Sequence, residues 1–227
     1  MNAGTYRRRV LTSVLAGLGL GFSLIVAIGA QNLYVLRQGL RREHVLAVAL
    51  ICAVSDMVLI ALGVSGIGLA LQAVPWLVGV VRWVGAAFLL VYAGMAAWRA
   101  LRPSGEALVA DPSSPAPSVH ARPGGTSAVT AQRLGTVILT CLALTWLNPH
   151  VYLDTVFLLG SIANSHGDER WAFAVGAMIA SVVWFFGLAY GARYLGRWLA
   201  TQRAWRVLDG VIAVVMVAIA INLALGA

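Results

Sequence analysis

Residues 134–161 read LGTVILTCLALTWLNPHVYLDTVFLLGS, a run that contains one acid, Asp154, and one proline, Pro149. A helix of about 20 predominantly apolar residues crosses the hydrocarbon core of a bilayer, so this run is long enough to do so. Pro149 has no backbone N–H and disfavours helical geometry at Asn148, the residue before it. The run therefore predicts a transmembrane helix that is kinked or broken near its middle.

The composition of the chain agrees with a membrane protein. Of 227 residues, 60% are apolar and only 11% are charged, with a mean hydropathy of +0.86. This excludes an ordinary water-soluble enzyme. The two cysteines, Cys52 and Cys141, lie far apart in apolar runs, so neither a disulfide framework nor a CxxC-type metal site is expected. No cofactor is expected either.

Five further charge-poor runs have the length of a membrane span: residues 10–36, 45–72, 76–98, 171–195 and 207–227. The predicted fold class is thus an all-α, polytopic integral membrane protein with six transmembrane helices. Residues 102–133 differ, because they hold five of the seven prolines together with glycines and serines. They predict a flexible cytoplasmic linker between two halves, residues 1–101 and 134–227.

The two halves match each other weakly, in the same order. Residues 28–36 align with 144–152, 53–55 with 179–181, and 82–85 with 207–210. Three spans per half would insert the second copy upside down, which gives the 3+3 inverted repeat of many secondary transporters. Chance similarity among helices rich in Ala, Val, Leu and Gly is the alternative. In inverted repeats the substrate lies where paired helices are interrupted, here Gly29 to Asn32 and Asn148–Pro149.

Two acids and a histidine lie well inside the predicted spans, away from the segment ends. A charge at the bilayer centre costs about 2.5–3.5 kcal/mol even on insertion scales, so an acid there needs a reason. Asp56 lies near mid-depth of its segment, and Asp154 follows Pro149 by one to two turns. His150 precedes Asp154 by four residues, on the same helix face. Their functional interpretation is binding of a cation or exchange of a proton. The alternative is that they neutralise one another or pair with nearby arginines.

Polar, uncharged side chains lie at both predicted interruptions. Gln31 and Asn32 lie at the first, and Asn148 lies at the second. Such amides often join membrane helices by hydrogen bonds, but their position predicts contact with a substrate. Tyr152 is close enough to the second interruption to touch a ligand.

The net charge of +8 comes from 16 arginines and no lysine, against eight acids. Eleven of these arginines lie in or beside loops 1–2, 3–4 and 5–6, so the positive-inside rule makes these loops cytoplasmic and places the C-terminus outside. A nucleic-acid partner is not expected. The triplet Arg7 to Arg9 opposes this orientation unless the first segment re-enters the membrane, and six full spans are favoured. Asp209, near the start of its segment, is expected to be solvated or paired with Arg206.

Two motifs resemble a known family. Residues 29–39, GAQNLYVLRQG, resemble the first-helix signature of the lysine exporter (LysE) family of bacterial amino-acid exporters. Residues 144–155, LTWLNPHVYLDT, resemble the branch that contains the lysine and arginine exporters. Shorter matches around Ser55–Asp56 and Ala180–Ser181 extend the resemblance over nearly the whole chain. The long linker and the arginine triplet depart from the family pattern without touching a motif.

The resemblance implies a homo-oligomeric exporter of L-lysine and L-arginine in the bacterial inner membrane, driven by an ion gradient. Our hypothesis is that Asp56 and Asp154 bind the cationic groups, while Asn32, Asn148 and free backbone groups bind the amino-acid backbone. Exchange of a proton at Asp56, Asp154 or His150 would make the cycle an antiport.

Other functions remain as alternatives. An exporter of neutral amino acids, such as homoserine or threonine, or of a divalent cation would belong to the same superfamily, although no Cys/His cluster suits a soft metal. A membrane enzyme that uses His150 and Asp154 is not expected, because the chain has no HExxH or GxSxG motif.

Overall fold

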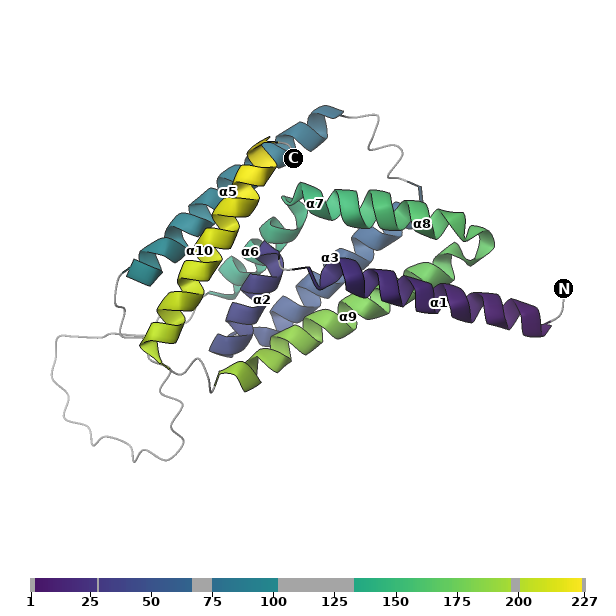
Figure 1. Cartoon of the computed structure of the whole chain (residues 1–227), viewed down its shortest axis with the longest axis horizontal. Coiled ribbons are helices and arrows are strands. Elements are labelled where there is room, and N and C mark those ends of the chain that lie inside the picture. Colours follow the sequence, from purple (N-terminus) through teal and green to yellow (C-terminus); the bar gives the residue numbers. More distant parts are fainter. Residues whose placement is uncertain (1–2, 28, 67–74, 102–132, 197–200, 226–227) are drawn as a thin grey trace.

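The computed structural model describes residues 3–27, 29–66, 75–101, 133–196 and 201–225. All regular elements in these ranges are helical (Figure 1). The elements of the first half are α1 (Ala3–Ile25), α2 (Ala30–Arg41), α3 (Val45–Val64) and α5 (Pro75–Leu101). Those of the second half are α6 (Leu134–Trp146), α7 (Pro149–Val151), η1 (Tyr152–Leu159), α8 (Gly160–Ser165), η2 (Gly167–Glu169), α9 (Arg170–Leu195) and α10 (Gln202–Leu225).

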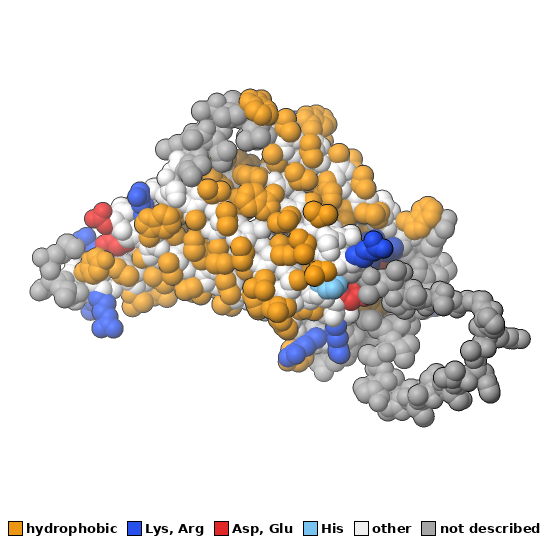
Figure 2. All heavy atoms as spheres, turned by 180° about the vertical axis from the view of Figure 1, so that it is seen from behind, with side chains coloured by type: hydrophobic (Ala, Val, Ile, Leu, Met, Phe, Trp, Pro, Cys, Tyr) orange, Lys and Arg blue, Asp and Glu red, His pale blue; other side chains and the backbone are white. Residues whose placement is uncertain are grey.

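The polytopic all-α prediction is confirmed. Among the described residues, five helices are long and apolar enough to cross a bilayer, and the bent pair of α6 with residues 149–165 raises the number of candidate spans to six. Hydrophobic side chains cover the middle of the face shown in Figure 2, whereas arginine and acidic side chains gather toward its two ends. That distribution suits a bilayer, in which the middle of the protein contacts lipid tails.

The bounds of several segments differ from those predicted. The run at 10–36 is two helices, α1 and α2, that begin at Ala3 and end at Arg41. Hydropathy misses both ends because charged and polar residues continue the helical backbone there. Helix α3 ends at Val64, and residues 67–72 of the predicted second segment lie outside the described residues, as do 102–132 of the linker.

Each half opens with an interrupted helix, α1–α2 in the first and α6–α7 in the second. The inverted repeat predicts a pair of interruptions at these two places, although the repeat itself stays a prediction. Helices α1, α2 and α3 pack against α9, while α5 and α10 lie side by side as an antiparallel pair (Figure 1). The interior is therefore shared by both halves.

Small side chains make these contacts close. Alanines fill much of the core, including Ala174, Ala177 and Ala180 of α9. A Cβ added to Gly17 of α1 would collide with the backbone of α9, and one added to Gly21 would lie only 3.0 Å from Cα of Ala177. Transmembrane helices associate by such close backbone approach, because lipid tails give apolar side chains no reason to prefer one another.

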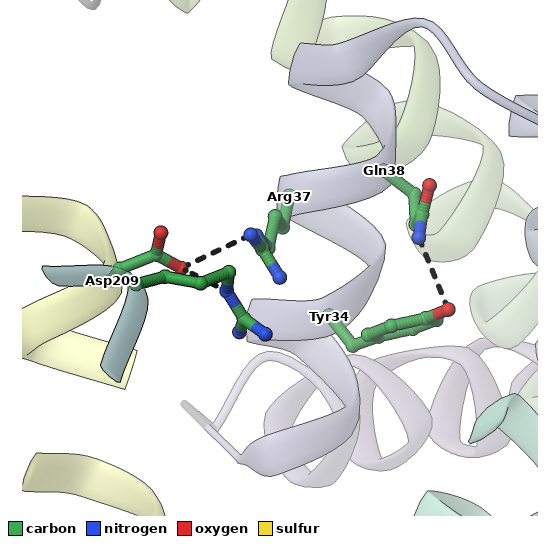
Figure 3. A network of polar contacts seen from close by, with 5 residues as sticks. Tyr34, Arg37, Gln38 and Asp209 are labelled. Carbon is green, nitrogen blue, oxygen red and sulfur yellow. Dashed lines mark hydrogen bonds and ion pairs between the residues drawn. The ribbon is translucent and has the colours of Figure 1, made fainter. Parts of the chain in front are cut away.

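A buried ion pair links the α5–α10 pair to α2. Nη2 of Arg37 lies 3.3 Å from Oδ1 of Asp209, and Nε of Arg99 lies 3.5 Å from the same oxygen. Figure 3 shows Arg37 of α2 facing Asp209. It also shows Nε2 of Gln38 donating to the hydroxyl of Tyr34, which lies one turn earlier in α2. The polar part of the motif at residues 29–39 thus joins three helices that are distant in sequence.

Candidate functional site

The first interruption lies between α1 and α2. Helix α1 ends at Ile25, and α2 begins at Ala30 after the extended residue Gly29. Asn32 reaches back across the gap, and its Nδ2 donates to the carbonyl oxygens of Ile25 and Ala27, both at 2.8 Å. The last carbonyls of a helix have no partner within it, so this side chain satisfies the end of α1 and fixes the position of α2.

The second interruption has a cause that the sequence predicts. Pro149 is buried and is the first residue of α7, and Asn148 before it has extended backbone angles, φ −100° and ψ 105°. Oδ1 of Asn148 accepts from the backbone N–H of His150 at 3.2 Å, which caps the new helix. The two helical parts are bent by 58° relative to each other.

Tyr152 spans the second interruption in the way that Asn32 spans the first. Its hydroxyl donates to the carbonyl oxygen of Trp146, the last residue of α6, at 2.8 Å. Tyr152 also begins η1, an eight-residue π-helical stretch that contains Asp154. π-helical turns are rare and occur frequently at functional sites. The wider turn changes the direction of the side chains that follow the break.

Helix α9 holds the start of α2 and the acid of α3 at neighbouring positions. Oγ of Ser181 donates to Oδ2 of Asp56 at 3.1 Å, and Nε1 of Trp184 donates to Oδ1 of Asn32 at 3.2 Å. Ser181 and Trp184 are three residues apart, so they lie on one face of α9, about 4.5 Å apart along its axis. Asp56 itself is buried, with 6% of its surface exposed.

These elements enclose a cavity of about 260 Å³. This volume lies slightly below the range of about 300–1,000 Å³ that is usual for small-molecule sites, so it suits a small ligand. Seven of the predicted site residues line it: Gly29, Gln31, Asn32, Asp56, Asn148, His150 and Asp154. The remaining wall comes mainly from aliphatic side chains and from Thr155, Phe185, Ile219 and Asn222.

The ionisable side chains of the cavity wall are mainly acidic, in a chain that is strongly basic. Two carboxylates, Asp56 and Asp154, lie in its wall, and none of the 16 arginines is among the described residues that line it. Asp56 is buried, whereas Asp154 is exposed. His150, which also lines the cavity, is half-buried. The arrangement favours a cationic ligand, because water-poor surroundings strengthen the attraction to a carboxylate.

Two predicted site residues are not among the described residues that line the cavity. Pro149 is buried, and the hydroxyl of Tyr152 donates to the carbonyl oxygen of Trp146. Pro149 thus shapes the site through the backbone. Contact between Tyr152 and a substrate stays a prediction that this geometry does not support.

Sequence reasoning missed Asn222, Phe185 and the two α9 side chains that position the site. Asn222 was detectable, because it is an amide within an apolar run, as Asn32 and Asn148 are. Ser181 and Trp184 lie within a matched motif, but only the fold shows which residues they bind.

Comparison with known proteins assigns the chain to a family. The family described as "LysE type translocator" matches residues 22–227, which include both interruptions and every residue of the cavity wall. The chain belongs to the LysE family. The resemblance noted in the two motifs is thereby confirmed.

Several relatives cover most of the chain. The lysine exporter LysE of Corynebacterium efficiens is 40% identical over 222 residues, 93% of this chain and 97% of that protein. The arginine exporter ArgO of Escherichia coli K12 is 41% identical over 210 residues, 92% and 91% of the two chains. A Mycobacterium tuberculosis H37Rv protein, provisionally named an amino-acid transporter, is 46% identical over 199 residues, 88% and 90%. No solved structure matches the chain.

Proposed function

We propose that this LysE-family protein is a secondary active exporter of L-lysine and L-arginine across the bacterial cytoplasmic membrane. The observation that carries the proposal is the cavity between the two interruptions, which has two carboxylates in its wall and no arginine among its described lining residues. A basic amino acid has one more positive than negative group, so it matches the sign of this cavity. Amino-acid export itself is supported by the names of the relatives.

In the proposed cycle, Asp56 and Asp154 receive the two cationic groups of the substrate. Nδ2 of Asn148 has no hydrogen-bond partner among the described residues, because only the oxygen of this amide caps α7, so it can donate to the amino-acid backbone. Asn32 has less to offer, since both its N–H groups and one lone pair of its oxygen are used within the protein. Release of the substrate against uptake of a proton at Asp56, Asp154 or His150 makes the exchange an antiport. We further propose that the chain is an inverted repeat and forms homo-oligomers.

The test is transport by the purified protein in proteoliposomes. Vesicles loaded with radiolabelled arginine or lysine are diluted into buffer with and without a pH gradient, and efflux is followed. The expected result is efflux that is faster than from loaded vesicles without the protein and that the pH gradient accelerates. The variants Asp56→Asn and Asp154→Asn are expected to lose at least 90% of this efflux, roughly a tenfold loss, because each removes a charge that the substrate needs.

The matched control is Asp168→Asn. Asp168 is an exposed acid of η2 that is not among the described residues of the cavity wall, so efflux is expected to stay within about twofold of the unmodified protein. Arginine efflux that persists in Asp56→Asn would remove this residue from the substrate path.

Two other substrates are tested in the same vesicles. Efflux of homoserine or threonine in place of arginine would favour a neutral amino-acid exporter. Efflux of a divalent cation would favour a divalent-cation exporter, although no three His, Cys, Asp or Glu side chains among the described residues gather closely enough to hold a metal ion.

A further inference from the structure

The start of α2 is a part of the cavity wall that suits an anion. Its cap residue, Gly29, has no side chain, so the start of this helix has no side-chain cap hydrogen bond among the described residues. The first hydrogen bond of the helix runs from the N–H of Leu33 to the carbonyl of Gly29, so the N–H groups of Ala30, Gln31 and Asn32 belong to the uncapped first turn. Free N–H groups and the helix dipole together attract negative charge.

Gln31 adds a second, independent donor at the same place. Its side chain is 9% exposed and Gln31 lines the cavity, yet the one interaction of its amide group among the described residues is with the thiol of Cys52, a weak acceptor, and its Nε2 has no oxygen or nitrogen acceptor. A buried amide N–H without an acceptor costs about 1–3 kcal/mol, so such a group is usually completed by a ligand. Because Nε2 only donates, the missing partner must be an acceptor.

The second interruption offers fewer donors to an anion, namely Nδ2 of Asn148. There the cap residue is Asn148, and its own Oδ1 already accepts from the N–H of His150. The two carboxylates, Asp56 and Asp154, would repel an anion placed beside them. Among the described lining residues, backbone N–H groups and a side-chain amide that lacks an oxygen or nitrogen acceptor thus occur together at Gly29 to Asn32.

We propose that the start of α2, with the Gln31 amide, binds the α-carboxylate of the exported amino acid. The assignment rests on the proposed function, since it concerns the same substrate. It makes the carboxylate a requirement for transport, and it fixes the orientation of the substrate, because the cationic groups must then lie toward the acids. A diamine or an amino-acid amide of the same length is accordingly a poor substrate.

The ligand side is tested with L-argininamide, which keeps both cationic groups of arginine but has no carboxylate. It competes with counterflow of radiolabelled L-arginine in proteoliposomes, at mildly acidic pH where its α-ammonium group stays charged. The inhibition constant of argininamide is expected to be at least about tenfold higher than that of arginine, which corresponds to one charge-assisted hydrogen bond or more. Agmatine, which lacks the carboxylate altogether, is expected to behave in the same way.

The protein side is tested at Gly29, whose backbone is extended and where an added Cβ meets nothing within 4 Å. Gly29→Asp places a carboxylate on the start of α2, where aspartate is a favoured cap. This internal anion occupies the proposed site, so the preference for arginine over argininamide is expected to fall to about twofold or to reverse. Gly29→Ala adds bulk but no acceptor, and it should keep the preference.

Gln31→Leu provides a second variant, in case Gly29→Asp folds poorly. Loss of its amide donor should narrow the preference several-fold, with folding checked by size-exclusion chromatography. Argininamide that competes as well as arginine with the unmodified protein would overturn the inference, and so would a full preference in both folded variants. Absence of arginine counterflow in the unmodified protein would instead contradict the proposed function.

Discussion

Asp209 illustrates how far the surroundings of one residue depend on distant parts of the chain. Its position near the start of a segment favours solvent or Arg206 as its partner, and this expectation is wrong. Asp209 is buried between Arg37 and Arg99, whereas Nε of Arg206 donates to the carbonyl of Ala100. Sequence spacing reveals neighbours on one helix, but it does not reveal which helix of the other half packs alongside.

Replacement of Asp209 should therefore destabilise the protein. In Asp209→Asn, Arg37 keeps its buried charge but loses the carboxylate, and removal of one partner from a buried pair typically costs about 3–5 kcal/mol. We expect a clearly lower melting temperature of the detergent-purified protein. Asp168→Asn, at an exposed acid, should change the free energy of unfolding by no more than about 0.5 kcal/mol, so its melting temperature should stay close to that of the unmodified protein. Equal melting of the two variants would show that the Asp209 pair contributes nothing.

The acids and amides of the site are the residues that sequence predicts best. Asp56, Asp154 and Asn148 stand out because polar groups are rare and costly within apolar runs. Their individual partners are not predictable in this way. The bond from Ser181 to Asp56 joins residues 125 apart in sequence, and it exists only because α3 and α9 pack together.

At the level of elements, the helix interruptions have local causes and their supports do not. Pro149 predicts its own break, because the ring removes a donor and restricts Asn148. Glycine and polar residues only suggest the first break, and the structure places it slightly earlier, with Ala30 to Asn32 already in α2. In both places a side chain after the break, Asn32 or Tyr152, satisfies a carbonyl at the end of the helix before it.

The crossing of α3 with η1 leads to a test at Gly63. A Cβ there would lie 2.7 Å from the carbonyl oxygen of Val156, so Gly63→Ala must push the π-helical stretch away from α3. Overpacking of this kind costs about 1–3 kcal/mol. A lower melting temperature and reduced efflux are expected, because Asp154 lies on the displaced stretch.

The control for this crossing is Gly19→Ala. Gly19 is an exposed glycine of α1 with nothing within 4 Å of an added Cβ, and alanine is the better helix former by up to about 1 kcal/mol. This variant should melt at the same temperature or higher. If Gly63→Ala behaves like Gly19→Ala, the close approach of α3 and η1 is not a constraint.

On the scale of the whole molecule, described helix ends that flank the loops placed on one side by the sequence lie toward one end of the structure. The ends of α2, α5 and α9 and the start of α10 lie toward the lower left of Figure 1, whereas the N-terminal end of α1 points to the opposite side. The chain thus passes from one end of the molecule to the other along α1 and α2. Which end faces the cytoplasm stays a prediction from the arginines.

Cysteine labelling in intact cells tests the orientation. Both native cysteines, Cys52 and Cys141, are buried, so single cysteines introduced at exposed sites give a clean signal. Asp168→Cys should react with a membrane-impermeant maleimide from outside, and Thr201→Cys only after the cells are permeabilised. Thr5→Cys should also react from outside if the first segment spans. The reverse pattern for Asp168 and Thr201 would invert the topology.

By itself, the sequence determined that this is an all-helical membrane protein of the LysE family, with interrupted helices and two intramembrane acids. Those features follow from local properties, namely apolar length, the restrictions of proline, and the cost of charge in lipid. Only the tertiary structure decided that the two interruptions and both acids share one cavity, that Asn222 joins it, and that Arg37 pairs with Asp209. Apolar helices carry little information about which neighbours they choose, because close fits of small residues select the partners.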